Sequence, residues 1–253
     1  MITKWSEICV EQYQEIINLE SDDNYSVELI SVLMDISVDD LEDLTMDDFE
    51  ELLSKVNFIN KQPTSIYKNT ITVDGIELYK LNLDGLLIGE FVDLENLIMD
   101  IGTNLPTILS ILYRMEVSKQ TKLHKQELEP YGDWIFHRGP LFSEVPITDV
   151  YGVITEYLKY RSTLFEAYSG LFDDGDGEEE DDEYKDFVDV NETGIQKRER
   201  LKTEATESSI KKWGWDSMVH RLAGGDTLKI EGVFNISIIQ GLNTLAIQKE
   251  LNI

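Results

Sequence analysis

Cysteine is almost missing from this chain of 253 residues, since Cys9 is the only one. A single cysteine cannot form an internal disulfide, which fits a reducing compartment. Long apolar runs are missing too, because no stretch approaches the ~18 residues that a membrane-spanning helix needs. The first residues, from Met1 to Ile8, include Lys4 and Glu7 and lack the apolar core of a signal peptide. These absences predict a cytosolic protein with no membrane partner.

Basic side chains are scarce, with 22 lysines and arginines against 50 aspartates and glutamates and a net charge of −28. Nucleic-acid binding needs a basic surface, so this balance predicts that nucleic acid is not the partner. The imbalance is uneven: residues 1–60 hold 16 acidic and 2 basic residues, whereas residues 191–231 hold 7 acidic and 8 basic ones. The plain interpretation is a solvated surface that keeps the protein soluble, and the alternative is a field that steers a basic partner.

Residues 1–60 show the spacing of an acidic helical unit. Apolar residues at steps of three and four predict a first helix, with Trp5, Ile8, Cys9, Tyr13, Ile16 and Ile17 on one face. A second helix is predicted over residues 25–36, with Asn24 as its cap. Capping patterns at Ser37-Val-Asp-Asp and Thr45-Met-Asp-Asp predict two short helices, whose first-turn carboxylates favour the positive end of the dipole. Their predicted buried sides are Leu41, Leu44, Phe49, Leu52, Leu53 and Val56.

Residues 61–172 begin with the clearest β signal of the chain. Two alternating runs flank Asp74-Gly75, a dipeptide that favours a two-residue turn, so one small β-hairpin is predicted. Helical spacing then continues to Met115, and Gly102 and Pro106 are predicted to separate two helices. Residues 118–146 are polar and interrupted by prolines, which predicts irregular structure, and one long helix is predicted over 147–171. The fold class is therefore mainly α (α+β), with the hairpin as its β part.

Residues 173–190 form an acidic low-complexity segment that we interpret as a disordered linker, because charges this dense repel one another. An EF-hand calcium loop would place glycine sixth and glutamate twelfth. Counted from Asp174, those positions hold Glu179 and Lys185, so the register fails. A loose, weak site for a divalent ion stays open as an alternative, and a solvated linker is the better interpretation.

The C-terminal helical segment, residues 191–253, carries the predicted partner-binding residues. Gly224-Gly225 suits a helix C-terminus, and the final helix is predicted to be capped near Asn235 or Ser237, where Ser237-Ile-Ile-Gln is a capping box. Two tryptophans, at 213 and 215, point in directions about 200° apart on a helix, so one ring is predicted to face away from the local core. Exposed tryptophans are frequent interface anchors, although both rings could instead be covered within the fold. The predicted partner-binding residues are Trp213, Trp215, Arg221, Leu242 and Leu245.

Motifs that carry catalysis are missing as well. The three histidines, His124, His137 and His220, share no metal-ligand spacing with Cys9, and Cys9 is predicted to be a small core residue. The chain has no Gly-x-Ser-x-Gly elbow, no phosphate loop and no dinucleotide-binding glycine motif. We therefore predict a protein that binds other proteins, with no catalytic residues, no metal and no cofactor.

Three segments carry a resemblance to a known class of proteins. The first begins at Trp5-Ser-Glu-Ile-Cys-Val-Glu-Gln-Tyr-Gln-Glu-Ile and continues through the acidic helices. The second is the hairpin with Asn82-Leu-Asp-Gly-Leu-Leu-Ile-Gly-Glu-Phe-Val-Asp-Leu behind it, and the third is Lys212-Trp-Gly-Trp-Asp-Ser-Met-Val-His-Arg-Leu-Ala-Gly-Gly-Asp with the last helix. In this order they resemble the tail assembly chaperones and baseplate-hub assembly proteins of tailed bacteriophages.

The resemblance implies a non-enzymatic protein of the host cytoplasm that binds unassembled phage tail or baseplate proteins. The acidic segment at 173–190 is not expected of the whole class. Two other classes stay open: a virion structural protein, such as an adaptor or baseplate subunit, and an acidic mimic of nucleic acid that occupies a DNA-binding protein. The mimic would need its carboxylates on a rigid surface, which the predicted disorder of residues 173–190 argues against. An enzyme is the least favoured class.

Overall fold

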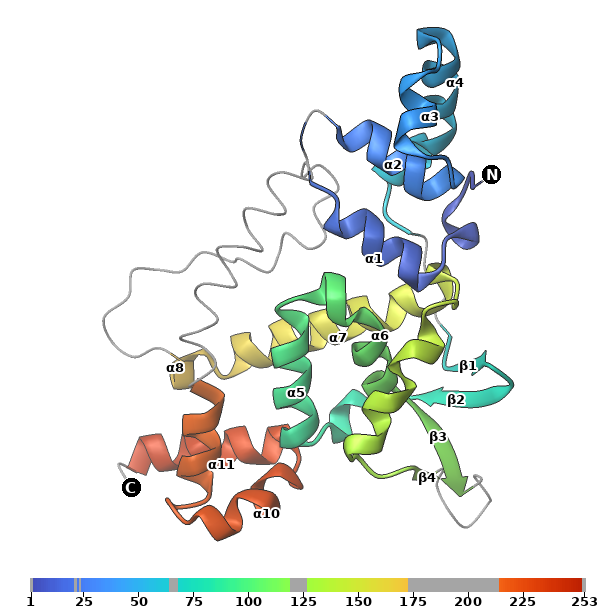
Figure 1. The fold of residues 1–253 in the computed structure, drawn as a ribbon. Helices are drawn as coiled ribbons and strands as arrows, with labels where there is room; N and C mark the ends of the chain where they lie inside the picture. The colour runs from blue at the N-terminus through green and yellow to red at the C-terminus, as the bar shows by residue number, and fades with distance from the viewer. Residues whose placement is uncertain are drawn as a thin grey trace.

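The structure is a computed structural model that describes residues 2–20, 22, 24–63, 68–118, 127–172 and 214–251. Helices predominate in this part of the chain, and one small antiparallel sheet lies beside them (Figure 1). The predicted fold class, mainly α (α+β), is thereby confirmed. The predicted acidic linker, residues 173–190, lies outside the described residues.

Short helices follow one another through the N-terminal part, namely η1 (Trp5–Glu7), α1 (Val10–Asn18), α2 (Tyr25–Met34), α3 (Val38–Glu42), α4 (Met46–Val56) and η2 (Asn57–Asn60). The caps predicted at Ser37 and Thr45 are confirmed, because the Ser37 hydroxyl accepts the N–H of Asp40 and the Thr45 hydroxyl accepts the N–H of Asp48. Asn24 is the N-cap residue of α2, as predicted, but its side chain makes no capping hydrogen bond. α2 ends at Met34, two residues before the predicted end, since Asp35 has a left-handed φ of 55° that stops the helix.

The predicted first helix is interrupted at residues 8–9. Ile8 accepts the backbone N–H of Ile147 and Val10 donates to the carbonyl of Val145, both at 2.9 Å, so these two stretches run antiparallel. The carbonyl of Ile8 is therefore used across the chain instead of within a helix, and α1 starts only after Cys9. The prediction that Cys9 lies on the packed face of a helix was wrong, because it is the partly exposed N-cap residue of α1.

A four-stranded sheet contains the predicted hairpin and extends it, with β1 (Thr70–Val73), β2 (Ile76–Lys80), β3 (Tyr113–Ser118) and β4 (Glu127–Leu128) in that order. All neighbours are antiparallel, and the hairpin register pairs Val73 with Ile76. Asp74 and Gly75 have φ values of 49° and 76°, the positive dihedrals that a tight two-residue turn requires.

The predicted helix up to Met115 was too long. The helix ends at Leu112, and the next residues join the sheet because Met115 pairs with Leu78 across β2 and β3. Part of the region 118–146 is also more regular than predicted, since it contains β4 and a 3-10 helix, η4 (Asp133–Phe142). Both differences come from pairing and packing with distant segments, which local spacing does not encode.

The centre of the molecule is a group of helices: η3 (Leu83–Gly85), α5 (Ile88–Ile98), α6 (Ile101–Leu112), α7 (Ile147–Ala167) and α8 (Ser169–Phe172). The predicted boundary at Gly102 and Pro106 was misplaced, because both residues lie inside α6. Proline has no N–H for the carbonyl four residues earlier, which here belongs to Gly102. Gln14 of α1 donates its side-chain amide to that carbonyl at 2.7 Å, so the orphaned acceptor is satisfied from another helix.

The C-terminal part consists of helical residues 214–222 and then η6 (Thr227–Lys229), α10 (Ile230–Phe234) and α11 (Ile238–Leu251). Gly224 and Gly225 follow the first of these helices with φ values of 64° and 75°, as predicted for a helix end. The hydroxyl of Ser237 accepts the N–H of Gln240, which confirms the predicted cap. Backbone hydrogen bonds from Ile88 to Ile236 and from Ile238 to Leu86 attach this part to the start of α5.

One hydrophobic core connects these parts. Its largest fully buried side chains include Phe91 of α5, Tyr113 of β3, Phe142 of η4 and Tyr157 of α7. The same cluster takes in residues of α1, α2 and α11. Figure 1 shows α5, α6 and α7 between the N-terminal helices on one side and α10 and α11 on the other. The predicted division into 1–60, 61–172, 173–190 and 191–253 stays a prediction.

Candidate functional site

The described C-terminal tryptophan lies in the core. Trp215 is 9% exposed, its ring is stacked on Phe165 at 5.9 Å between centroids, and it forms a T-shaped pair with Phe91 at 4.8 Å between centroids. Burial of this kind suits the structural alternative for Trp215 better than an anchor for a partner. Trp213, the other tryptophan of the predicted site, lies outside the described residues.

The other three predicted partner-binding residues differ in exposure. Leu242 and Leu245 face the core from α11 and are buried, whereas Arg221 is exposed. Two apolar residues that the sequence interpretation did not select, Ile247 and Leu251, are exposed on α11. They are four residues apart and therefore share one face of the helix. That face is exposed, whereas the face with Leu242 and Leu245 is buried. The structure thus brings Leu242 and Leu245 into the interior and leaves Arg221 on the surface.

A second surface with exposed apolar residues lies at the other end of the molecule, on residues 37–56, which we call the α3–α4 arm. Met46 is 73% exposed, and Val38, Leu44 and Leu53 are each more than a third exposed. The prediction that Leu44 and Leu53 supply the buried side of these helices was therefore wrong. Leu41 and Val56 are the fully buried residues of the arm, and Figure 1 shows α3 and α4 projecting beyond α2, away from the sheet.

The α3–α4 arm is strongly acidic. It holds eight carboxylates (Asp39, Asp40, Glu42, Asp43, Asp47, Asp48, Glu50 and Glu51) and one lysine, Lys55. Within the described part of the chain, one of these carboxylates, Glu51, forms an ion pair, with Lys55 at 2.6 Å. Asp40 and Asp48 accept the hydroxyls of the caps Ser37 and Thr45. The other acidic residues of the arm are exposed, as are Val38, Leu44, Met46 and Leu53, so the arm presents acidic and apolar side chains on the same two helices and their connection.

Carboxylates in the interior are paired and serve the fold. Glu95 of α5 accepts the Nε–H of Arg161 at 2.6 Å and the hydroxyl of Tyr157 at 3.0 Å. Glu90 accepts a guanidinium N–H of Arg114 at 2.6 Å and also the backbone N–H of Leu87 at the start of α5. These pairs join helices and strands to one another, which satisfies buried charges that would otherwise be costly.

Glu129 and Asp93 complete this set of internal carboxylates. Glu129 pairs with Arg138 and accepts the backbone N–H of Met115 at 2.9 Å. Asp93 accepts the hydroxyl of Tyr131, and desolvation by burial raises the pKa of Asp93 above its ordinary value despite that hydrogen bond. Both carboxylates are therefore bound by side chains or backbone groups of the same chain.

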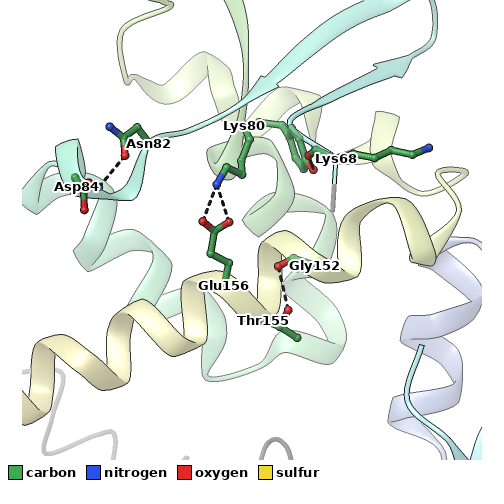
Figure 2. A network of polar contacts seen from close by, with 8 residues as sticks. Lys68, Lys80, Asn82, Asp84, Gly152, Thr155 and Glu156 are labelled. Carbon is green, nitrogen blue, oxygen red and sulfur yellow. Dashed lines mark hydrogen bonds and ion pairs between the residues drawn. The ribbon is translucent and has the colours of Figure 1, made fainter. Parts of the chain in front are cut away.

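Two lysines in or next to the sheet form ion pairs with residues of α7. Lys80 of β2 reaches both carboxylate oxygens of Glu156 at 2.7 Å, and Figure 2 shows its side chain pointing at that glutamate. Lys68, just before β1, forms an ion pair with Asp149 at 2.7 Å. The positive charges of Lys68 and Lys80 are therefore engaged within the molecule.

Metal-binding chemistry finds no support in the described ranges, which contain no group of three histidine, cysteine, aspartate or glutamate side chains arranged to hold an ion. The predicted absence of a calcium loop concerns residues 173–190, and His124 belongs to the stretch 119–126; both lie outside those ranges. None of the described helices is both long and apolar enough to span a membrane.

Comparisons with known proteins give no relatives: the chain matches no protein-family model, and no curated protein or solved structure is significantly similar to it.

Proposed function

We propose that this chain is a non-enzymatic assembly chaperone of a tailed bacteriophage that binds unassembled tail or baseplate proteins in the host cytoplasm. The observation that carries protein binding is the α3–α4 arm, where apolar side chains such as Met46 stand exposed among carboxylates. Exposed apolar side chains gathered on one projecting element favour contact with another protein. The resemblance of three segments, at Trp5, Asn82 and Lys212, supports the phage class.

Binding of nucleic acid is not part of the proposal, because the net charge of −28 repels a phosphate backbone. The proposal also includes no metal, nucleotide or redox cofactor. Elemental analysis of the purified chain is expected to find no stoichiometric transition metal. One tightly held zinc or iron per chain would contradict this part of the proposal.

The experiment is co-purification with the tail and baseplate proteins encoded beside this chain's own gene. Each is produced with the tagged chain, and complexes are separated by size-exclusion chromatography. We expect a stable complex with at least one unassembled component, and we expect purified phage particles to lack the chain.

Two results would contradict the proposal in different ways. A chain present in stoichiometric amount in purified particles would be a virion structural protein, such as an adaptor or baseplate subunit. A chain that forms no complex with any neighbouring tail or baseplate protein would not be their chaperone.

A further inference from the structure

The apolar face of α4 is wider than the part that the rest of the molecule covers. Phe49, Leu52 and Val56 turn toward the core. At about 100° per residue, Met46 and Leu53 lie within about 20° of each other, directly beside that covered face. Their exposure leaves an apolar stripe about two helical turns long, with Glu50 between them on the same side.

Charge flanks this stripe. The arm carries eight acidic residues and one basic residue, a net of −7. Seven of those carboxylates have no basic partner among the described residues, where Glu51 is paired with Lys55. Carboxylates in the first turn stabilise a helix by interacting with the positive end of its dipole. This explains the presence of Asp39 and Asp40 in α3 and of Asp47 and Asp48 in α4. Glu42, Asp43 and Glu50 have no such role. Asp43 directly precedes the exposed Leu44, Glu42 lies two residues before Leu44, and Glu50 lies between Met46 and Leu53 along α4.

A second copy of the chain is a poor occupant for this stripe. Two arms that each carry a net charge of −7 would face each other with like charge, and like-charge juxtaposition opposes association. An uncharged apolar segment would fill the stripe but leave the surrounding carboxylates without partners. A segment with apolar residues on one side and lysine or arginine beside them satisfies both parts of the surface.

We propose that the exposed stripe of Met46 and Leu53 docks a basic amphipathic helix of a partner protein. A helix presents apolar anchors at three- and four-residue steps, which match a stripe of two turns. Lysines and arginines beside those anchors meet Glu42, Asp43 and Glu50, which steers association and makes it weaker at high salt. This inference rests on the proposed function, since it names the surface and the partner chemistry for protein binding.

The test uses the full chain and three fluorescently labelled peptides of about 18 residues, a length that supports a stable helix. The first peptide has leucine at helical steps and lysine elsewhere, the second has the same composition with the apolar face scrambled, and the third has glutamate in place of lysine. Fluorescence anisotropy measures the dissociation constants. In parallel, methyl-labelled methionine reports the site by NMR, because the chain has six methionines and a Met46→Leu variant identifies the relevant signal.

Two variants with paired substitutions locate the site. Met46→Ala with Leu53→Ala removes the stripe, and Ile247→Ala with Leu251→Ala removes another exposed apolar pair, on α11, as a matched control. We expect the first to weaken binding of the basic peptide by roughly tenfold or more and the control by about twofold or less. Replacing Glu42, Asp43 and Glu50 by their amides should weaken binding and reduce its dependence on salt.

The proposal is supported if the basic amphipathic peptide binds, the scrambled and acidic peptides bind at least about tenfold more weakly, and the Met46 methyl signal shifts. It is overturned if the scrambled peptide binds equally well, if the arm variant binds like the wild type, or if the Met46 signal stays unchanged at saturation. The methyl shift is measured in the wild-type chain, so it decides even if a variant loses stability.

The two proposals fail separately. If the arm variant still co-purifies with a tail component as the wild type does, the docking site is wrong while the chaperone function stands. If the wild type binds the basic peptide at Met46 but no tail or baseplate protein, the docking site stands and the phage function is wrong.

Discussion

At the scale of single residues, three ion pairs lie in the interior of the described part of the chain, and the pair of Arg161 with Glu95 is one of them. Arg161 and Glu95 are both less than a tenth exposed, and the guanidinium Nε–H meets both carboxylate oxygens, at 2.6 and 2.8 Å. Desolvating two charges is costly, so such a pair contributes little net stability. Removing one partner, however, leaves the other charge buried and unpaired.

We predict that Arg161→Met lowers the free energy of unfolding by about 3–5 kcal/mol. The double variant with Glu95→Leu should recover a large part of that loss, because no buried charge remains. Chemical denaturation measures both. The control is Lys229→Met at the exposed pair with Asp226, where a change below about 1 kcal/mol is expected. Equal losses at the two sites would show that burial of the pair does not matter.

From the burial of Tyr13 we predict a loss of stability at alkaline pH. Burial, and secondarily the neighbouring Tyr151, raises the pKa of its phenol well above the ordinary value of about 10. Below pH 10 both the folded and the unfolded chain keep this proton, so the contribution to stability is intact. Above pH 10 only the unfolded chain releases it, and unfolding becomes easier by about 1.4 kcal/mol at pH 11.

Tyr13→Phe should therefore lose about 1.4 kcal/mol less than the wild type between pH 8 and pH 11. Urea unfolding at a series of pH values measures the two slopes. Parallel slopes would mean that Tyr13 ionises in the folded protein as it does in the unfolded chain.

At the scale of elements, α6 shows how a helix continues through a proline. Its carbonyl at Gly102 is satisfied by Gln14, and a Cβ at Gly102 would lie 2.0 Å from Asn18 Oδ1. Both contacts come from α1, so Gly102 and Pro106 are compatible with a helix interior only because α1 lies against it. A local interpretation of these two residues necessarily predicts a break.

The hairpin turn gives a prediction for an element that the sequence indicated correctly. Gly75 has a φ of 76°, whereas Gly85 has no left-handed φ, and a Cβ at either position would meet no atom within 4 Å. Backbone conformation is thus the main difference between them. Gly75→Ala should lower the free energy of unfolding by about 1 kcal/mol, and Gly85→Ala should change it by less than half as much. Thermal unfolding followed by circular dichroism measures both, and a neutral Gly75→Ala would contradict the strained-turn account.

At the scale of the whole molecule, the acidic surface sets the response to salt. A net charge of −28 repels itself in the compact state. Raising the ionic strength from about 0.01 M to about 0.15 M shortens the Debye length from about 30 Å to about 8 Å and screens this repulsion. We predict a higher Tm at the higher salt, measured by scanning calorimetry. The variant with amides at Glu42, Asp43 and Glu50 should show a smaller rise, and a Tm that falls with salt would contradict the prediction.

Local patterns were sufficient for the features that neighbours in the chain determine. The caps at Ser37, Thr45 and Ser237 and the turn at Asp74-Gly75 depend on hydrogen bonds and dihedrals within four residues, and all four lie where they were predicted. Helical periodicity likewise predicted a mainly α chain. The composition indicated the acidic character of the α3–α4 arm.

Only the tertiary structure decided which apolar residues are covered. Leu44 and Leu53 have the spacing of buried residues, yet each stays more than a third exposed, whereas Phe91 and Phe165 pack against Trp215 from other helices. β3 likewise replaces the end of a predicted helix because β2 lies beside it. Burial and strand pairing depend on segments far apart in the sequence. For that reason local sequence determined the helical character, the caps and the charge of this protein, and packing determined where several helices end and which side chains stay exposed.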